Sequence, residues 1–404
     1  MVPSSGAGRA LPLLIAAQVL AQTSTITLIS ISALIGFDLA ADKSLATLPV
    51  AASMLSGAAL TIPASLLMAR IGRRGGFTLG AMAGLACALL AVVALRRHSF
   101  GLFISASVCS GAYQAFFQFY RFAATDAAAP ERRSRVLSLV VSGGIVAAFA
   151  GPALARYATR GETSDFGTTF QVLAVLALIA VAVLWALPAS LRVPRAASAA
   201  TVRDWPTLLR QPLFLTALCG SAVGMSVMVT VMTSTPLAMQ WCGIPRALSP
   251  TVIQWHMLGM FVPSLFVGDL IRRFGVLNIM LCGAVLLLAQ CLVAVSGVSY
   301  AHFVVALALL GLGWNFLYVG GSSLLAQAWR PGEESRLQGA HDLVVFTLAS
   351  LGSLSSGALL QWSGWNAVNL LALPAIAVAA VVIVVQWRLR GAPVAAMRNT
   401  RTGS

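Results

Sequence analysis

A cluster of sulfur and imidazole side chains is the part of this sequence best suited to chemistry. The chain of 404 residues contains only 12 Met and 4 His. Between residues 225 and 260 it gathers Met225, Met228, Met232, Met239, Cys242, His256, Met257 and Met260. Cu(I) accepts thioether sulfur and neutral imidazole as ligands, whereas Mg²⁺ and Ca²⁺ prefer carboxylate and carbonyl oxygen. The cluster therefore predicts a site for a soft metal ion.

Spacing on two expected helices selects four of these residues. Positions three, four and seven apart share a helix face, so Met228 and Met232 form one stripe, which Met225 continues. His256 and Met260 form a second stripe on the next, antiparallel helix. At 1.5 Å per residue, the pair Met232 and His256 lies about 10 to 12 Å deep, and the pair Met228 and Met260 about 16 to 18 Å deep. We expect metal ligation by Met228, Met232, His256 and Met260, with Met225, Met239 and Cys242 as accessory ligands and Met257 as a packing residue.

Two other interpretations compete with a metal site. Methionines at helical spacing are more often packing residues, although a histidine in mid-membrane favours function because ionisable groups are costly there. A set of polar and aromatic residues offers the second interpretation, in which they line a central cavity or form hydrogen bonds between helices: Gln18, Gln22, Gln114, Gln118, Asn315 and Tyr318. We expect His98, His302 and His341, which lie near the ends of apolar segments, to be solvated at the membrane interface.

The composition indicates an all-α integral membrane protein. Hydrophobic residues make up 59% of the chain and charged residues 9%, which leaves too little polar surface for a water-soluble protein of this size. Each bilayer crossing needs about 20 apolar helical residues. Apolar segments lie at about 11–36, 46–69, 75–95, 99–120, 135–156, 168–190, 212–239, 248–271, 276–297, 300–328, 338–361 and 366–388. These predict twelve transmembrane helices.

The distribution of basic residues predicts the topology. A net charge of +15 would suggest nucleic acid in a soluble protein, but here the charges lie in short loops between apolar segments. Of the 26 Lys and Arg residues, 20 fall on the side that holds both termini, so we expect both termini in the cytoplasm. The predicted domains are an N-terminal six-helix bundle at 1–190, a cytoplasmic linker at 191–211, a C-terminal six-helix bundle at 212–390 and a cytoplasmic tail at 391–404.

The two halves repeat each other in sequence. The segment 130–135 aligns with 331–336, and Gly151 then falls opposite Gly352, both at an offset of 201 residues. Gly72 aligns with Gly275 at an offset of 203 residues. Two related six-helix halves are typical of a transporter in which the halves rock about a site between them.

The loops around these two glycines resemble the signature of the major facilitator superfamily, in which a Gly, an Asp, a basic residue and a second Gly follow in order. In the first half Arg70, Gly72 and Arg73 fit the pattern, while Ser65 and Ala69 replace the first Gly and the Asp. In the second half Gly268, Arg273 and Gly275 fit, Arg272 replaces the Asp, and Asp269 lies one place after Gly268. The resemblance implies candidate gating residues at Arg70, Gly72, Arg73, Asp269, Arg273 and Gly275.

A narrower resemblance rests on the metal-binding stripes. Met228-x-x-x-Met232 followed by His256-x-x-x-Met260 resembles the signature of the CcoA-like bacterial copper importers, a major facilitator branch that supplies copper for assembly of cbb3-type cytochrome oxidase. The resemblance implies import of copper, as Cu(I) by ligand type, across the bacterial cytoplasmic (inner) membrane by alternating access. It also implies delivery to a cytoplasmic copper chelator or chaperone, with copper as substrate and no cofactor.

Two alternatives remain open at this point. One is an organic-solute transporter or drug/proton antiporter of the same fold, with the amide and aromatic residues lining its cavity. The other is a membrane sensor that transports nothing, although the loops are too short for a signalling domain. An enzyme is not expected, because no nucleophile, base and orienting partner occur together in the sequence. Membrane lipid is an expected partner and nucleic acid is not.

Overall fold

The fold is built from helices throughout the part of the chain that we describe. The computed structural model describes residues 5–126, 133–159, 166–188, 203–330 and 333–399, in which no strand occurs. The first half contains α1 (Ser5–Leu39), η1 (Lys43–Leu45), α2 (Leu48–Arg96), α3 (Phe100–Phe117), α4 (Tyr120–Asp126), α5 (Arg133–Ala158) and α6 (Phe166–Trp185). The second contains α7 (Trp205–Leu209), α8 (Pro212–Trp241), η3 (Arg246–Leu248), α9 (Ser249–Phe261), η4 (Pro263–Leu265), α10 (Val267–Phe274), α11 (Val276–Ser296), α12 (Tyr300–Leu325), α13 (Glu334–Leu370) and α14 (Leu373–Asn399).

The helices are long and apolar enough to cross a membrane many times. Among the described residues, eight helical stretches are long and apolar enough to span a membrane. The bent pair of helices at 246–265 and 267–274 would make a ninth span. Two of the eight, Lys43–Arg96 and Arg336–Arg390, are about twice the length of one crossing and break at Gly72 and Gly364. Counting these two stretches twice and adding the 26-residue α5 accounts for the twelve predicted crossings.

Glycines produce the breaks because they adopt backbone conformations that other residues avoid. Gly72 has φ +81° within α2, and Gly275, between α10 and α11, has φ +86°. A Cβ at either position would meet nothing within 4 Å. Glycine is therefore favoured there by the positive φ and not by a lack of space for a side chain. The two glycines aligned in sequence therefore make the same turn in the two halves.

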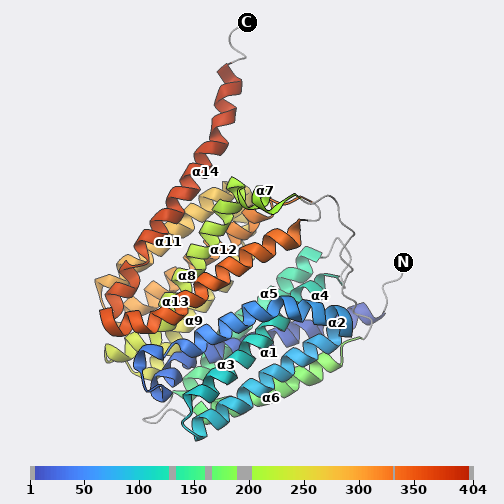
Figure 1. The fold of residues 1–404 in the computed structure, drawn as a ribbon, viewed down its shortest axis with the longest axis vertical. Coiled ribbons are helices and arrows are strands. Elements are labelled where there is room, and N and C mark those ends of the chain that lie inside the picture. Colours follow the sequence, from blue (N-terminus) through green and yellow to red (C-terminus); the bar gives the residue numbers. More distant parts are fainter. Residues whose placement is uncertain (1–4, 127–132, 160–165, 189–202, 331–332, 400–404) are drawn as a thin grey trace.

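The two halves also repeat each other in three dimensions. A Cβ on Gly151 would lie 2.8 Å from the side chain of Ile26 on α1, and one on Gly352 would lie 2.5 Å from Thr230 Oγ1 on α8. Each glycine therefore lets the fifth predicted span of its half pack closely on the first. Figure 1 shows the halves as two lobes, with α2, α3 and α6 in one and α11, α12 and α14 in the other.

Polar contacts join the two lobes at one end of the molecule, which we call the Asp38 end. Arg246 donates two hydrogen bonds of 2.9 Å to the carboxylate of Asp38. Arg156 Nη1 lies 2.6 Å from Gln254 Oε1, and the Gly357 amide lies 3.2 Å from Thr47 Oγ1.

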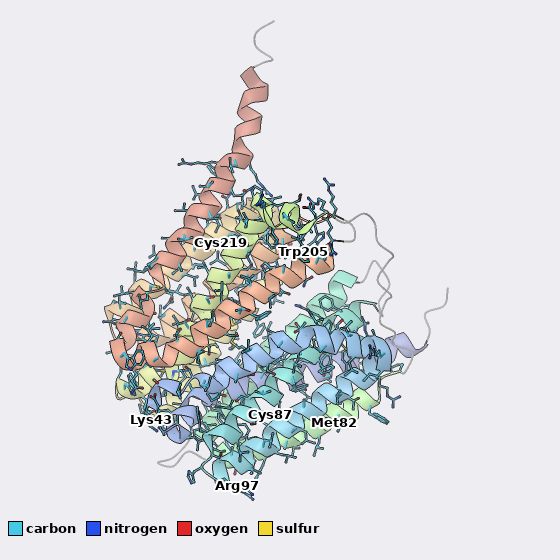
Figure 2. The ribbon with its side chains drawn as sticks, viewed as in Figure 1. Lys43, Met82, Cys87, Arg97, Trp205 and Cys219 are labelled. Atoms are coloured by element: carbon cyan, nitrogen blue, oxygen red, sulfur yellow. The ribbon has the colours of Figure 1, made fainter. Side chains whose placement is uncertain are left out.

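Labelled residues distinguish the two ends of the molecule. Figure 2 shows Lys43 and Arg97 toward the same end of the lobes, whereas Trp205 lies toward the other end. The predicted topology makes the Asp38 end the outer one, since Lys43, Arg97 and Arg246 belong to the six basic residues that it places outside. The other three are Arg96, Arg156 and Arg160.

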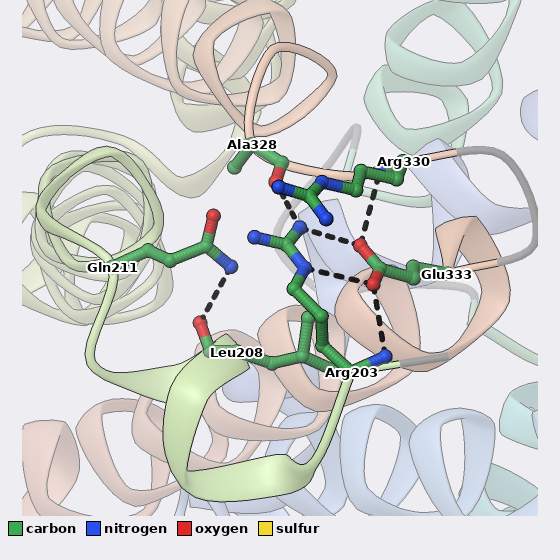
Figure 3. Close-up of polar contacts among 6 residues, drawn as sticks. All are labelled: Arg203, Leu208, Gln211, Ala328, Arg330 and Glu333. Atoms are coloured by element: carbon green, nitrogen blue, oxygen red, sulfur yellow. Dashed lines mark hydrogen bonds and ion pairs between the residues drawn. The ribbon is translucent and has the colours of Figure 1, made fainter. Parts of the chain in front are cut away.

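The described end of the predicted linker is attached to the second lobe. Most of that linker lies outside the described residues, but Arg203 donates to both carboxylate oxygens of Glu333, from Nε at 2.8 Å and from Nη2 at 2.5 Å (Figure 3). The Arg203 hydrogen bonds lower the pKa of Glu333 to about 2. Because this pKa lies below that of a free carboxyl group, the ion pair is fully formed above that ordinary value and is lost only as the pH falls toward about 2. It is therefore intact at neutral pH.

Candidate functional site

A cavity between the two lobes brings together most of the sulfur side chains that the sequence singled out. We call it the thioether cavity, and its volume is about 120 Å³. Its second-lobe wall consists of Met225, Met228, Val229 and Met232 from α8 with Met257 and Met260 from α9. Five thioether groups therefore face the first lobe across one space, and three of the four predicted metal ligands, Met228, Met232 and Met260, are among them.

The first lobe supplies a more polar wall to the same cavity. Ser32 on α1, Ser53 on α2 and Gln114 on α3 line it, together with the apolar side chains Leu28, Ile29, Val50 and Met54. Helix α3 can approach α2 closely here because residue 111 is a glycine, and a Cβ on Gly111 would overlap the carbonyl oxygen of Ser53. The small residues thus place Gln114 beside Ser53.

A second cavity, which we call the glutamine cavity, continues from the first. It has a volume of about 200 Å³ and shares Met54 and Gln114 with the thioether cavity. Gln118, Thr61 and Phe117 line it from the first lobe, and Phe346 on α13 lines it from the second. Along α2, its lining residues follow those of the thioether cavity in the direction away from Thr47. The combined space therefore extends from the middle of the molecule away from the Asp38 end.

Hydrogen bonds orient both glutamine side chains of this space. Gln114 Nε2 donates to Ser53 Oγ at 3.0 Å, and Gln118 Nε2 donates to Thr61 Oγ1 at 2.7 Å. Since each amide nitrogen is held by a hydroxyl group, each amide oxygen remains an acceptor for a solute. Gln114 and Gln118 therefore combine the two roles considered for them, because they line the cavities and also form hydrogen bonds between α3 and α2.

His256 is placed differently from its expected partners. Its side chain is fully buried, and its Nδ1 lies 3.0 Å from the carbonyl oxygen of Leu307 on α12. Nε2 has no hydrogen-bond partner among the described residues, and the ring is not part of the lining of the thioether cavity. The structure therefore brings together three of the four predicted metal ligands and directs the fourth toward α12.

Close packing of α9 on α12 explains this orientation. A Cβ on Gly259 would lie 2.6 Å from the carbonyl oxygen of Ala308, and one on Gly311 would overlap the carbonyl oxygen of His256. Asn315 on α12 also donates a 2.7 Å hydrogen bond to the carbonyl oxygen of Met260. These contacts fix the rotation of α9, so that His256 faces α12 while Met257, predicted as a packing residue, faces the cavity. Met257 is also a buried member of the hydrophobic core, as expected of a packing residue.

The predicted accessory ligands are separated from one another. Met225 lines the thioether cavity, as its place in the α8 stripe predicts. Met239 is buried at the far end of α8, with 1% of its surface exposed, and Cys242 is exposed at the cap of the same helix. Neither residue belongs to the thioether cavity. Among the described residues, no group of three or more His, Cys, Asp or Glu side chains is placed to hold one metal ion.

The candidate gating residues lie in the two equivalent turns. Arg70 is exposed and Arg73 is buried, on either side of Gly72. In the second turn Asp269 accepts a 2.6 Å hydrogen bond from Arg272, with both side chains mostly exposed, and Arg273 lies over the ring of Phe274. Asp269 therefore pairs within its own helix, and the gating role of the whole set stays a prediction.

The other polar residues predicted for the cavity have structural contacts. Gln18 and Gln22 on α1 face Gly143 and Gly144 of α5. Asn315 joins α12 to α9 and η4 by hydrogen bonds to Met260 and Ser264. Tyr318 stacks on Trp314, with ring centroids 5.0 Å apart. Sequence reasoning missed Met54 and Phe346 as lining residues, because nothing in their spacing separates them from ordinary core residues.

Comparison with known proteins supports the architecture along the whole chain. The sequence profile of the Major Facilitator Superfamily matches residues 13–249 and 234–402. The riboflavin transporter RfnT of Brucella anthropi is 36% identical over 395 residues, which cover 97% of this chain and 99% of that protein. The uncharacterized MFS-type transporter YdeG of Bacillus subtilis is 28% identical over 85% of this chain and 84% of its own length.

Solved structures with the same fold are more distant in sequence. An auto-inhibited POT family peptide transporter superposes with a TM-score of 0.65 at 13% identity, covering 93% of this chain and 96% of that one. A bacterial homologue of the iron transporter ferroportin, in an outward-facing state, gives a TM-score of 0.63 at 13% identity, with 93% and 98% covered. The profile match and the 36% identical relative establish the family that the sequence signature implied. The chain belongs to the Major Facilitator Superfamily, and is therefore a multi-pass membrane transporter and not an enzyme.

Proposed function

We propose that the protein takes up a planar heteroaromatic solute of the riboflavin class through the joined thioether and glutamine cavities, by alternating access. The observation that carries this proposal is the pairing of a thioether wall with a wall of oriented glutamine amides in one space between the lobes. The volumes of about 120 and 200 Å³ together reach the lower end of the range of about 300–1,000 Å³ typical of sites for drug-sized ligands.

The chemistry of the two walls suits a flavin ring. The isoalloxazine system is flat and aromatic, and one of its edges carries an imide with alternating carbonyl oxygens and a nitrogen donor. Methionine sulfur makes favourable contacts with aromatic rings and adapts its shape to them. The oxygens of Gln114 and Gln118 accept hydrogen bonds from the imide or from the hydroxyl groups of a ribityl chain. The relative from Brucella anthropi, which is named a riboflavin transporter and aligns over nearly the full length of both chains, supports the same class of solute.

Copper import is the second candidate, because Met228, Met232 and Met260 of the predicted motif line one cavity. The His256 ring faces α12, so this site as it stands offers sulfur without the predicted imidazole. A bacterial inner-membrane location, cytoplasmic termini and delivery to a cytoplasmic copper chelator or chaperone stay predictions. The interpretation as a sensor that transports nothing is set aside, since the chain is a transporter of the family established above.

Uptake measurements separate the two solutes. Cells that require external riboflavin and lack their own carrier are supplied with this protein, and labelled riboflavin and total copper are measured in the same cultures. We expect riboflavin accumulation to rise above that of cells carrying an empty vector while copper stays unchanged. A rise in copper alone, lost in Met228→Leu, would replace the flavin proposal with the copper one.

A further inference from the structure

Two aromatic side chains of α12 stack on each other beside the site described above. The ring centroids of Trp314 and Tyr318 lie 5.0 Å apart, and the ring planes are inclined by only 12°. Both side chains are half-buried, and neither belongs to the lining of the thioether cavity or of the glutamine cavity. We call them the aromatic pair. The pair is an ordered surface that the two described cavities do not use.

Close packing on two sides fixes the direction in which α12 presents the aromatic pair. Asn315 donates a 2.7 Å hydrogen bond to a backbone carbonyl oxygen of α9, so its face meets α9. Leu317 faces α8, because a Cβ on Gly224 of α8 would lie 3.0 Å from the Cβ of Leu317. A helix turns by about 100° per residue, which places Trp314 and Tyr318 on the arc between these two faces. Since α8 and α9 form the second-lobe wall of the thioether cavity, the pair points between them toward the space between the lobes.

The neighbours of Tyr318 show how far along this space the pair lies. The Tyr318 side chain is within electrostatic reach of Arg121 on α4 in the first lobe and of Asp342 on α13. Gln118 and Phe346 line the glutamine cavity. Arg121 lies three residues beyond the first of them, and Asp342 lies four residues before the second. On α13 this step leads away from the Asp38 end, which that helix contacts only farther along its length. The aromatic pair therefore adjoins the end of the glutamine cavity that is farther from the Asp38 end.

The indole nitrogen of Trp314 is a hydrogen-bond donor that lacks an acceptor. Nε1 is buried and has no hydrogen-bond partner among the described residues. An indole N–H only donates, and it usually finds a partner when it is buried, because an unpaired buried polar group costs free energy. Stacking on Tyr318 fixes the plane of the indole ring and thereby the direction of the N–H bond. The pair is thus oriented to bind an acceptor atom from outside the chain.

The donor of the second lobe complements the acceptors of the first. Gln114 and Gln118 keep their amide oxygens available, because hydroxyl groups of Ser53 and Thr61 hold the amide nitrogens. An imide edge carries an N–H group between two carbonyl oxygens, so its N–H suits an amide oxygen and its carbonyl oxygen suits the Trp314 N–H. A flat ring with such an edge can therefore form hydrogen bonds with both lobes at once.

We propose that Trp314 determines specificity by donating a hydrogen bond from Nε1–H to a ring carbonyl oxygen of the solute, and that Tyr318 is a positioning residue that holds the indole ring in place. This role rests on the proposed function, since the same class of solute is recognised. A flat aromatic solute without ring carbonyls leaves the donor unpaired, and a site built around a hydrogen bond rejects such analogues strongly. The ligand class is therefore a heteroaromatic ring with carbonyl groups on its edge.

Binding of two flat tricyclic compounds to the purified protein tests this role. Lumichrome carries the carbonyl groups of the flavin ring, whereas phenazine has a similar shape and carries none. In Trp314→Phe, which keeps an aromatic ring but not the N–H, we expect lumichrome affinity to fall about tenfold and phenazine affinity to change less than about twofold. Tyr318→Leu, the second variant if Trp314→Phe does not fold, is expected to lower lumichrome affinity about threefold with the same selectivity. Unchanged lumichrome affinity, or equal losses for both compounds, would overturn the proposal.

Two control variants and riboflavin itself separate the possible causes of a negative result. Tyr318→Phe keeps the stacked ring, and Trp362→Phe changes an indole that is 77% exposed, so both are expected to bind lumichrome as the wild type does. Riboflavin binding to the wild type tests the proposed function without any variant. If the wild type binds riboflavin and Trp314→Phe leaves lumichrome affinity unchanged, the role of Trp314 is overturned and the flavin proposal stands. If the wild type binds neither riboflavin nor lumichrome, the flavin proposal is overturned and the role of Trp314 with it.

Discussion

The two walls of the central cavity differ in chemistry although they come from related halves of the chain. The first-lobe wall presents hydroxyl and amide groups from Ser32, Ser53 and Gln114, continued by Gln118. The second-lobe wall presents the thioether groups of α8 and α9 and the ring of Phe346. A metal ion has no distinct faces, so two cavity walls of different chemistry offer it little advantage. A flat molecule with one apolar face and polar edges can contact both walls at once, and four changes test this comparison in order of expected effect.

Removing the amides from the first-lobe wall should have the largest effect. In the double variant Gln114→Leu/Gln118→Leu, the solute loses two hydrogen bonds, and we expect riboflavin affinity to fall on the order of 100-fold. The measurement is the KM for uptake into vesicles. Gln171→Leu, at an exposed position on α6, is the matched control and should leave KM unchanged. An unchanged KM in the double variant would mean that the amides do not contact the solute.

Removing the aromatic ring from the second-lobe wall should have an intermediate effect. Phe346→Ala deletes the ring that α13 contributes to the glutamine cavity. We expect KM for riboflavin to rise about fivefold, which corresponds to the loss of one aromatic contact. Phe346→Leu retains apolar area without the ring, and a KM as high as that of Phe346→Ala would show that stacking and not burial is responsible.

Replacing sulfur while keeping volume should have a small effect on a flavin and a large one on copper. Met228→Leu conserves shape, so riboflavin KM is expected to change less than about threefold. The same variant removes one of three thioether groups that would hold Cu(I) in this cavity. Riboflavin uptake and copper accumulation measured side by side therefore decide what the thioether wall contacts. Loss of copper uptake in this variant would contradict our account.

Changing His256 should have the smallest effect on transport. His256→Leu loses one hydrogen bond to the carbonyl oxygen of Leu307 but also removes the unpaired buried Nε2. We expect the free energy of unfolding to change by no more than about 1 kcal/mol, and riboflavin uptake to stay at the wild-type level. Thermal unfolding in detergent and uptake in vesicles check the two statements. A folded variant that no longer transports riboflavin would show that His256 takes part in transport.

Sequence patterns predicted the architecture well because membrane burial leaves strong signals. Apolar runs of about 20 residues follow from the requirement for paired backbone groups in the membrane, and the sequence repeat of Gly72 and Gly275 indicated two equivalent turns. The orientation that the loop charges indicate stays a prediction. The stripe of Met225, Met228 and Met232 was likewise readable, since helical spacing alone places these residues on one face.

The orientation of α9 could not be predicted from its own residues. The four-residue spacing shows that His256 and Met260 share a face of α9. It does not show which neighbouring helix that face packs against. The contact is decided by Gly259 and Gly311, which let α9 approach α12 and direct His256 toward Leu307. Gly259 and Gly311, two small residues on different helices, are the sequence signal that would have indicated this orientation of α9. His341 was expected to be solvated at the membrane interface, but it is buried, because its exposure depends on how α13 packs.

Equilibrium binding to the purified protein tests the account most directly. Riboflavin fluorescence is titrated with the wild type, with Gln114→Leu/Gln118→Leu and with Met228→Leu/Met232→Leu, each in the presence and absence of Cu(I). We predict saturable riboflavin binding that the amide variant weakens, the methionine variant largely keeps and Cu(I) does not displace. Absence of riboflavin binding, together with Cu(I) binding that the methionine variant abolishes, would contradict the account.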